Sequence, residues 1–569
     1  MKKILYPLAF LLLFASCYQD KGNYDYTFDT MNAIDSVKFM PEAEEQLNGL
    51  TIEFTQPLTA ADTLQRVLVT CKQSLMNNLD NLDFTWIRNY TRDGKGRKDT
   101  VTTKGYMDVV LPLGKPITYN VLLRIHDKTT DLSRYAQFNV ATRPIFKNSL
   151  FVLHGTPGNM LLGNVEKVGA AVNVRTNAYA LVHPELGNPF ANAMRLMYQA
   201  TVTFNRNFQV IESDNLVAFQ NGDEALVFKP FGLDRKLDNF KHYVLPFSEQ
   251  GLLTVDQIGM VGDPSNQSDY YYIIGKDGRF VTARARLSFK FPAQAEDGEK
   301  NYKVTAGVIT SENFIFWDGK NNRFLHVNRD DGYGIWGEPQ AYYAQLNNPL
   351  KDAHVDFSKL PKALSPVGKT GVYGYIQYRE NYEQEHPFFI FKDASGQYYL
   401  YELTPVNTDK GNNGDSGGGI ADTDAPAYTI KGQVLEGFSP SDVSSIRYNT
   451  WFPTNYVFYI DGANVIRYNI SNGDKVIIYT APAGYEVACM KFREENTMLY
   501  SADLGRYLSI GLNKGDKGAV TELKLTVGGD VDETFRSAVY SRDKDGHEFG
   551  KIADIQFVHE YSYQLPNRQ

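Results

Sequence analysis

The stretch YVFYIDGANVIRYNISNGDKVIIY, residues 456–479, decides the fold class of this chain. Its apolar runs are separated by the pairs Asp461-Gly462 and Asn472-Gly473. Asp-Gly and Asn-Gly pairs form tight hairpin turns whose twist matches that of two antiparallel strands. The stretch therefore predicts three antiparallel strands in 24 residues, at Tyr456–Ile460, Val465–Ile470 and Val476–Tyr479.

Looser copies of this unit recur in the second part of the chain, with turns near residues 222, 278, 319, 395, 462 and 515. Self-similar meanders of this size are typical of the blades of a β-propeller, because one blade cannot bury both of its faces alone. We therefore predict that residues 149–569 form a propeller of six to eight blades, with seven favoured. A set of stacked β-sandwiches with similar hairpins is the alternative.

Residues 31–145 carry shorter strand signals. Turns containing Gly and Asp separate six apolar runs, which lie at Leu50–Phe54, Arg66–Cys71, Phe84–Tyr90, Met107–Leu111, Thr118–Ile125 and Arg134–Ala141. Six or seven short strands in about 115 residues are typical of an immunoglobulin-like β-sandwich. Trp86 falls inside one of these runs. We expect it to be the central core residue of this domain and not a functional group.

The N-terminus has the composition of an export signal. Two lysines precede the apolar run Ile4–Phe14, which is too short to cross a bilayer as a mature helix. The residues Phe-Ala-Ser before Cys17 look like a bacterial lipobox, which implies cleavage before Cys17 and acylation of its thiol and amine. We expect residues 1–16 to be a lipoprotein signal peptide and residues 17–30 to be a lipidated tether. An ordinary signal peptide with a chance cysteine is the alternative.

The amino-acid composition favours an all-β protein. The chain has 37 Tyr, 34 Phe and 46 Gly, which suit half-buried pleated sheets joined by tight turns. Its net charge is −8, from 66 acidic and 58 basic residues, so we expect no nucleic-acid partner. Beyond Cys17 only Cys71 and Cys489 remain, and we expect them to be buried thiols without a disulfide.

One Gly- and Asp-rich loop contains short sequences that match parts of catalytic and metal-binding motifs. Residues 414–418 spell GDSGG, but Ser416 lacks the strand-then-helix context of a hydrolase nucleophile, and no His is followed by Cys as in trypsin-like proteases. The loop aspartates do not have the spacing of an EF-hand; they are Asp409, Asp415, Asp422 and Asp424.

The nine histidines show no HxH or HExxH spacing. We therefore predict no catalytic residue, no metal site and no cofactor. A pair of carboxylates brought together only in space would not be visible in the sequence.

Aromatic residues on two predicted surface segments are the candidate ligand-binding groups. Flat aromatic faces stack on sugar rings and on peptide side chains with little loss of entropy. The alternative is that these side chains cover the ends of the sheets as part of the core. The candidates are Tyr333, Trp336, Tyr342, Tyr343, Trp451 and Phe452.

Several segments together resemble one known family. Residues 17–26 read CYQDKGNYDY, the strand Phe84–Arg88 contains Trp86, residues 119–127 read YNVLLRIHD, and a further strand opens at Asn148–Gly155. In these features the first 155 residues resemble the PKD-like family of surface lipoproteins in Gram-negative gut bacteria. The resemblance implies a PKD-like domain, attachment to the outer membrane and association with SusC/SusD-type nutrient uptake systems. It implies no catalytic residue.

The sequence and this resemblance together predict a non-catalytic, lipid-anchored outer-membrane protein that faces the cell exterior. Asp20 is the acidic residue that follows Cys17 in the segment that resembles a surface-export signal. The protein would bind a glycan or peptide nutrient, or dock on a SusC/SusD-type transporter. A propeller hydrolase or lyase acting on polysaccharide and a structural scaffold without a small ligand are the alternatives. The sequence leaves the ligand's identity and the oligomeric state open.

Overall fold

The computed structural model of the chain describes residues 32–559 with interruptions, and it divides the chain into an N-terminal unit, Met1–Ile145, and a C-terminal unit, Phe146–Gln569. The interruptions are 47–48, 58–62, 75–76, 93–94, 112–116, 144, 169–170, 205–209, 223, 238–243, 246–254, 264–267, 285–288, 291–300, 310–312, 329–350, 380–383, 407–427, 453–454 and 495–503.

The N-terminal unit contains two β-sheets among its described residues, and its predicted strands are confirmed. One sheet has the order β2 (Glu44–Gln46), β3 (Gly49–Thr55), β9 (Leu132–Arg143), β8 (Thr118–Asp127), β5 (Leu82–Arg92) and β6 (Lys95–Thr102). The other has the order β1 (Ile34–Met40), β4 (Leu64–Gln73) and β7 (Tyr106–Val110).

Trp86 is the central core residue of this unit, as predicted. Its side chain is fully buried, and its ring lies edge-on to Phe138 with centroids 6.1 Å apart. Its Nε1 donates a hydrogen bond of 2.8 Å to the Lys104 carbonyl, so the indole leaves no unpaired polar atom in the core.

The C-terminal unit contains seven sheets among its described residues, and nearly all of the strand pairs are antiparallel. The first sheet contains β10 (Ser149–His154), β11 (Leu161–Val168), β12 (Ala171–Arg175) and β37 (Ile552–Val558), and the second contains β13 (Ala193–Phe204), β14 (Val210–Asn221), β15 (Glu224–Lys229) and β16 (Asp234–Leu237). The third sheet contains β17 (Val244–Leu245), β18 (Val255–Asp263), β19 (Ser268–Gly275), β20 (Phe280–Arg284) and β21 (Phe289–Lys290). The fourth contains β22 (Val304–Ile309), β23 (Asn313–Asp318), β24 (Arg323–Asn328) and β25 (Lys351–Asp352).

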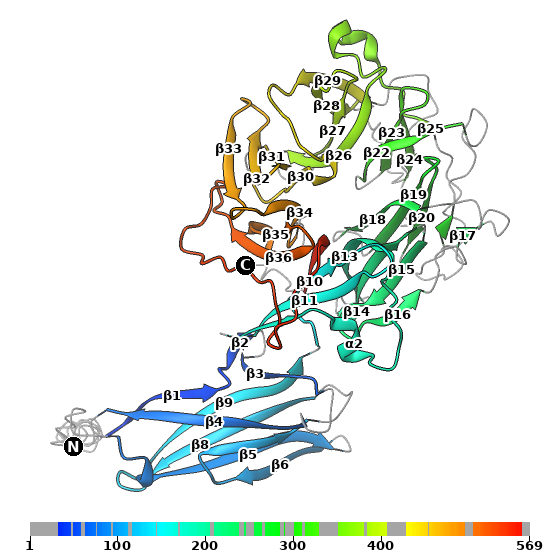
Figure 1. Cartoon of the computed structure of the whole chain (residues 1–569). Helices are drawn as coiled ribbons and strands as arrows, with labels where there is room; N and C mark the ends of the chain where they lie inside the picture. The colour runs from blue at the N-terminus through cyan, green and yellow to red at the C-terminus, as the bar shows by residue number, and fades with distance from the viewer. Residues whose placement is uncertain are drawn as a thin grey trace, which may run out of the picture. The chain divides into compact units, whose positions relative to one another are not determined.

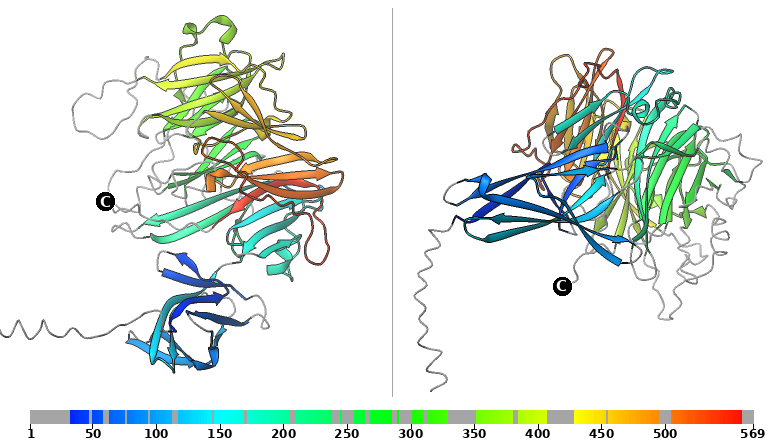
Figure 2. Two further views of the ribbon diagram at one scale, coloured as in Figure 1. Left: turned by 90° about the vertical axis from the view of Figure 1, so that its left-hand side faces the viewer. Right: turned by 90° about the horizontal axis from the view of Figure 1, so that it is seen from below.

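The fifth sheet contains β26 (Thr370–Arg379), β27 (Gln384–Lys392), β28 (Tyr398–Pro405) and β29 (Tyr428–Val434). The sixth contains β30 (Arg447–Tyr448), β31 (Tyr456–Asp461), β32 (Asn464–Asn469) and β33 (Lys475–Thr480). The seventh contains β34 (Glu486–Phe492), β35 (Tyr507–Lys514) and β36 (Lys517–Lys524). Figures 1 and 2 show these sheets following one another within the unit. Among the described residues, no helix is long and apolar enough to span a bilayer.

The prediction for residues 456–479 is confirmed. β31, β32 and β33 form an antiparallel meander, and the turns contain Gly462 and Gly473 with φ values of 58° and 78°. A positive φ of this size is easily adopted by glycine and costs other residues energy, which explains why these turns carry glycine. The all-β fold class is confirmed as well.

Neighbouring sheets pack face to face through apolar cores. One core joins residues of the β22–β25 and β26–β29 sheets, including Trp317 and Phe391, whose ring centroids lie 4.9 Å apart. The next joins the β26–β29 and β30–β33 sheets, and a third joins the β30–β33 and β34–β36 sheets. These four sheets therefore bury apolar residues against one another, which stabilises this part of the unit.

The last strand of the chain completes the first sheet of the unit. β37 pairs with β10 in antiparallel register from Ser149↔Val558 to His154↔Ile552. Asp554 of β37 forms an ion pair of 2.7 Å with Lys491 Nζ and accepts a hydrogen bond of 2.8 Å from the Leu196 N–H. Lys491 also donates to the Leu196 carbonyl at 2.7 Å. Strands from three sheets, β13, β34 and β37, are thereby tied together.

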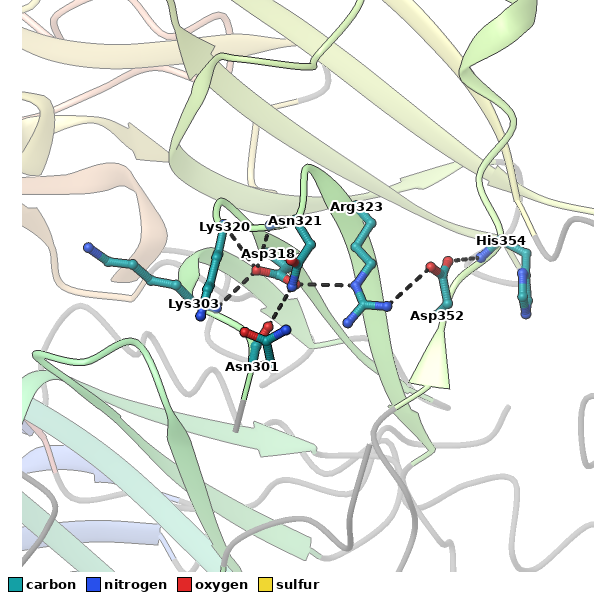
Figure 3. Close-up of polar contacts among 8 residues, drawn as sticks. All are labelled: Asn301, Lys303, Asp318, Lys320, Asn321, Arg323, Asp352 and His354. Atoms are coloured by element: carbon teal, nitrogen blue, oxygen red, sulfur yellow. Dashed lines mark hydrogen bonds and ion pairs between the residues drawn. The ribbon is translucent and has the colours of Figure 1, made fainter. Parts of the chain in front are cut away.

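Asp318 completes the hairpin between β23 and β24 (Figure 3). Its side chain is fully buried. The carboxylate accepts five hydrogen bonds of 2.7–3.3 Å, from the backbone N–H groups of Lys303, Lys320 and Asn321, from Asn321 Nδ2 and from Arg323 Nε. All of its acceptor positions are used inside the protein, so this carboxylate has a structural role.

Candidate functional site

Most of the predicted site residues lie outside the described residues. These are Cys17, Tyr333, Trp336, Tyr342 and Tyr343; Ser416 and the four aspartates of its loop, for which no function was predicted, lie outside the described residues as well. Trp451 and Phe452 are described, and they lie in the segment between β30 and β31.

Phe452 is part of the apolar core. It is 3% exposed, and its ring lies 5.4 Å from Phe458 and 5.9 Å from Phe492. The structure thus places this ring where the alternative interpretation expected it, inside the sheet packing.

Trp451 is half-buried and lies against the backbone of Gly505. A Cβ added at Gly505 would come within 1.6 Å of Trp451 Cδ1, so only glycine leaves room for this ring. Asn449 holds the segment in place, because its Nδ2 donates to the Glu494 and Gly505 carbonyls at 3.0 and 2.8 Å.

Tyr448, at the end of β30, contacts β26. Its N–H donates to Tyr373 Oη at 3.0 Å, and its ring stacks on Tyr375 with centroids 4.1 Å apart. Tyr375 also stacks on Phe388 of β27, at 5.2 Å. The end of β26 is therefore bordered by aromatic faces from two sheets.

Five residues at these strand ends, which we call the strand-end cluster, each bury a polar side-chain atom that has no hydrogen-bond partner. An unpaired buried polar group costs about 1–3 kcal/mol, so native proteins pair nearly all of them. The unpaired atoms are Tyr375 Oη, Gln377 Oε1, Trp451 Nε1, Asn455 Oδ1 and Glu494 Oε2.

The residues of the strand-end cluster differ in burial from some other residues that carry an unpaired atom. Trp317 Nε1 and Tyr401 Oη are also unpaired, but both side chains are fully buried. In the cluster only Tyr375 is buried, and the other four residues are half-buried and reach the surface. The unpaired atoms themselves have almost no exposure to solvent in all five residues.

His386 and Glu402 form a buried pair beside the cluster. His386 Nδ1 lies 2.9 Å from Glu402 Oε1, with the side chains 7% and 11% exposed. In the sheet register His386 stands opposite Gln377, and Phe388 stands between Tyr375 and Glu402. The pair is therefore next to the cluster on adjacent cross-strand positions.

Burial changes the ionisation of two members of the cluster. Desolvation raises the pKa of Glu494 to about 8, so this carboxyl is largely protonated at neutral pH. Desolvation also raises the pKa of Tyr375 well above 10, and the nearby Tyr448 raises it further. Both groups are therefore uncharged under ordinary conditions and able to donate a hydrogen bond.

The sequence contains no signal for most of this site. Trp451 was the only member of the cluster among the predicted binding residues. Gln377, Asn455 and Glu494 come from the end of β26, the start of β31 and the end of β34, and only the packing of the sheets brings these elements together.

One group of possible metal ligands occurs among the described residues, at Asp543, Asp545 and His547, whose ligand atoms lie within 4.8 Å of one another. The Asp543 carboxylate already accepts from the N–H groups of Asp545 and His547 and from Thr176 Oγ1, at 2.9–3.0 Å. These bonds make Asp543 the centre of a turn, and nothing in its surroundings indicates a bound cation.

Part of the chain matches a known family. Residues 17–186 match the PKD-like family, in agreement with the resemblance of the first 155 residues. No curated protein sequence resembles the chain closely enough to count as a match.

Several solved structures share a weak likeness with the chain. A quinonprotein alcohol dehydrogenase-like protein from Bacteroides thetaiotaomicron is 9% identical, with 89% of this chain and 96% of that chain covered and a TM-score of 0.38. The WD40 domain of SCAP from fission yeast is 9% identical, with coverage of 73% and 95% and a TM-score of 0.31.

An auxiliary nutrient binding protein from Bacteroides thetaiotaomicron is 10% identical, with 89% and 88% covered and a TM-score of 0.23. At such TM-scores these likenesses carry no argument about this chain.

Proposed function

We propose that this chain is a non-catalytic lipoprotein of the outer membrane that binds a nutrient, a glycan or a peptide, at the cell exterior. The observation that carries the proposal is the strand-end cluster. Its five residues each bury a polar atom that has no hydrogen-bond partner, and four of these residues are half-buried. A ligand with its own donors and acceptors would remove the cost of leaving them unpaired.

Binding of the full-length chain, purified in detergent, to glycan and peptide arrays tests the proposal. We expect signal on one of the two arrays. Absence of binding on both would overturn nutrient capture and favour a scaffold that has no small ligand.

The membrane location rests on Cys17 and on the family match of residues 17–186. Mass spectrometry of the N-terminal fragment should find a diacylglyceryl group on Cys17, and Cys17→Ser should release the protein from the membrane fraction. Co-purification with a SusC/SusD-type transporter tests the partner that the resemblance implies. Retention of Cys17→Ser in the membrane would contradict lipid anchoring.

We infer that the seven sheets of the C-terminal unit close into a seven-bladed propeller. The pairing of β37 with β10 supports closure, since strands from the two ends of the unit share one sheet. The contacts of Lys491 and Asp554 with Leu196 support it further. A chain truncated before Ile552 should lose cooperative unfolding, because β10 would then keep an unpaired edge.

A second candidate function is a hydrolase or lyase acting on polysaccharide, and the His386–Glu402 pair favours it, because a histidine with a carboxylate partner is a common general base. Both side chains are largely buried, however, which favours a structural role for the pair. Incubation of surface polysaccharides with the protein, followed by a reducing-end assay, separates the two functions. Product formation that His386→Gln abolishes would establish the enzyme.

A further inference from the structure

The three-stranded sheet of the N-terminal unit presents large apolar side chains on its outward face. The inward positions of its strands, such as Val67 and Met107, are buried in the core of the unit. Side chains alternate between the two faces of a strand, so the positions between them point away from that core. Four of these outward residues are large and apolar. They are Met40, Leu64, Leu68 and Val110, with exposed fractions of 60%, 59%, 41% and 71%.

The strand register joins these four residues into one surface, which we call the outward patch. Leu64 stands directly opposite Val110, and Leu68 stands between Met40 and Tyr106. Residues opposite each other on one face of a sheet have Cβ atoms about 4.5–5.5 Å apart, so their side chains meet. Single exposed apolar residues are ordinary, whereas a contiguous apolar patch marks a surface that meets a membrane or a partner.

The charged residues inside the outward patch neutralise each other. Arg66 stands opposite Asp108 in the register, and its Nε lies 2.6 Å from Asp108 Oδ1. The Arg66 guanidinium also lies over the Tyr106 ring, 4.0 Å from its centroid. The row between Leu64 and Leu68 therefore carries no net charge, which lowers the cost of bringing the patch to an apolar surface.

Two lysines continue this face toward the start of β1. Lys38 and Lys72 occupy outward positions of β1 and β4, and both are exposed. The flanking acidic residues lie outside the paired outward positions, Asp35 at the bulge of β1 and Glu42 beyond its end. Apolar side chains bordered by lysines suit a lipid surface with anionic headgroups, because apolar groups enter the acyl boundary while ammonium groups stay among the headgroups.

The length of the chain before β1 favours a lipid surface over a soluble partner. Residues 17–31 separate Cys17, the proposed site of lipid attachment, from Asn32, the first described residue. Even fully extended, a segment of this length spans at most about 55 Å. The anchor would therefore hold the outward patch at a high effective concentration relative to the membrane, without any binding from solution.

We infer that the outward patch, together with Lys38 and Lys72, rests on a lipid surface with anionic headgroups. This inference rests on the proposed lipid anchor at Cys17 and goes beyond it, because an anchor on a tether does not select which face of the N-terminal unit meets the membrane.

Quenching of tryptophan fluorescence by brominated lipids compares the two sheets of the N-terminal unit. Val110→Trp places an indole in the outward patch, and Tyr135→Trp places one on β9 of the other sheet, where Tyr135 is 59% exposed. Both variants keep the four native tryptophans, which give the same background. Each full-length, lipidated protein would be reconstituted into brominated vesicles of phosphatidylcholine, with or without phosphatidylglycerol. Thermal unfolding verifies that each variant is folded.

We expect lipid quenching of Val110→Trp to exceed that of Tyr135→Trp about twofold or more in vesicles with phosphatidylglycerol, because its indole enters the boundary between headgroups and acyl chains. The excess should shrink in pure phosphatidylcholine, and also when Lys38→Glu and Lys72→Glu are added to Val110→Trp, because the attraction to anionic headgroups is then lost.

Flotation of the proteins with the vesicles separates this inference from the proposed anchor. Equal quenching of the two variants in protein that floats would overturn the inference and leave the anchor standing. Shielding of Val110→Trp from aqueous acrylamide without lipid quenching would mean that a protein surface covers the patch, which would also overturn it. An excess that neither the lipid composition nor the lysine substitutions change would overturn the role of anionic headgroups. Protein that does not float would overturn the anchor itself.

Discussion

The two ends of the β26–β29 sheet differ in whether their polar groups have hydrogen-bond partners. At the hairpin end, the Asp393 carboxylate accepts from the N–H groups of Ser395 and Gln397 and from Tyr399 Oη, at 2.9–3.0 Å. Hydrogen bonding, first from the Ser395 hydroxyl, lowers the pKa of Asp393 to about 2. At the other end, Tyr375 Oη and Gln377 Oε1 are buried without a partner.

This contrast shows at which end of the sheet the polar groups are paired within the chain itself. A hairpin brings its own donors to an aspartate through residues two to four positions away, so local sequence suffices to pair it. At the opposite end, no such turn brings donors to Tyr375 Oη and Gln377 Oε1. The hairpin end is therefore the end whose polar groups are paired by local sequence.

The largest expected effect is at the hairpin ends. Asp318→Ala should lower the free energy of unfolding by about 3 kcal/mol, because the change leaves three backbone N–H groups and Arg323 without their buried acceptor. Urea unfolding of the full chain measures it.

Asp461, at the equivalent position of the β31–β32 hairpin, is exposed. Asp461→Ala should therefore change the stability by about 0.5 kcal/mol or less. Equal losses in the two variants would contradict the view that buried carboxylates complete the hairpins.

The next effect is a loss of stability at high pH that is caused by Glu494. Burial raises the pKa of Glu494 to about 8, above the usual 4.5 of an unfolded glutamate. The stability that its neutral form provides is complete below pH 4.5 and is lost as the pH rises through about 8.

Compared with Glu494→Gln, the wild type should lose about 2 kcal/mol or more between pH 5 and pH 9. Parallel stability curves for the two proteins over this range would show that Glu494 is not held in its neutral form.

A smaller effect with the opposite sign is expected at His154, at the hairpin end of β10. The Gly550 N–H donates to Nδ1 at 3.0 Å, so Nε2 carries the proton and donates to the Thr176 carbonyl at 2.7 Å. Burial lowers the pKa of His154 below its usual 6.5. The stability of this arrangement is therefore present above pH 6.5 and falls as the pH drops through the lowered pKa.

Thermal unfolding between pH 7 and pH 4.5 should show this loss in the wild type, and His154→Gln should have a flatter profile. An acid-induced loss of the same size in both proteins would assign it to other groups.

The smallest effect compares Gln377 with Gln397 in the absence of ligand. Gln377→Met should leave the stability unchanged or raise it by about 1 kcal/mol, because an unpaired buried oxygen is removed. Gln397→Met should lower it by about 1 kcal/mol, because two hydrogen bonds are lost. Denaturant midpoints measure both changes, and a clear loss in Gln377→Met would mean that its side chain is paired after all.

The strands could be predicted from the sequence because their signals are local. The run 456–479 contains its own turns, and β31, β32 and β33 lie within one or two residues of the predicted positions. The burial of Trp86 could be predicted as well, because the alternation of a strand places an apolar residue at this position on the buried face of the sheet.

The candidate site could be predicted only in small part. Trp451 was singled out as an aromatic residue before a predicted strand, yet its neighbour Phe452 proved to be core. The sequence alone does not distinguish an aromatic side chain that is buried at the end of a sheet from one that is exposed there. Gln377, Asn455 and Glu494 belong to no motif, because glutamine, asparagine and glutamate are ordinary residues at strand ends.

The sequence alone determined the all-β class, the strands and their turns, because hairpin formation depends on alternation and on Gly, Asp and Asn at neighbouring positions. Tertiary structure alone brings β37 back to pair with β10 and leaves polar atoms of Gln377, Asn455 and Glu494 buried without partners. Both depend on contacts between residues far apart in the chain, and such contacts leave no local pattern in one sequence.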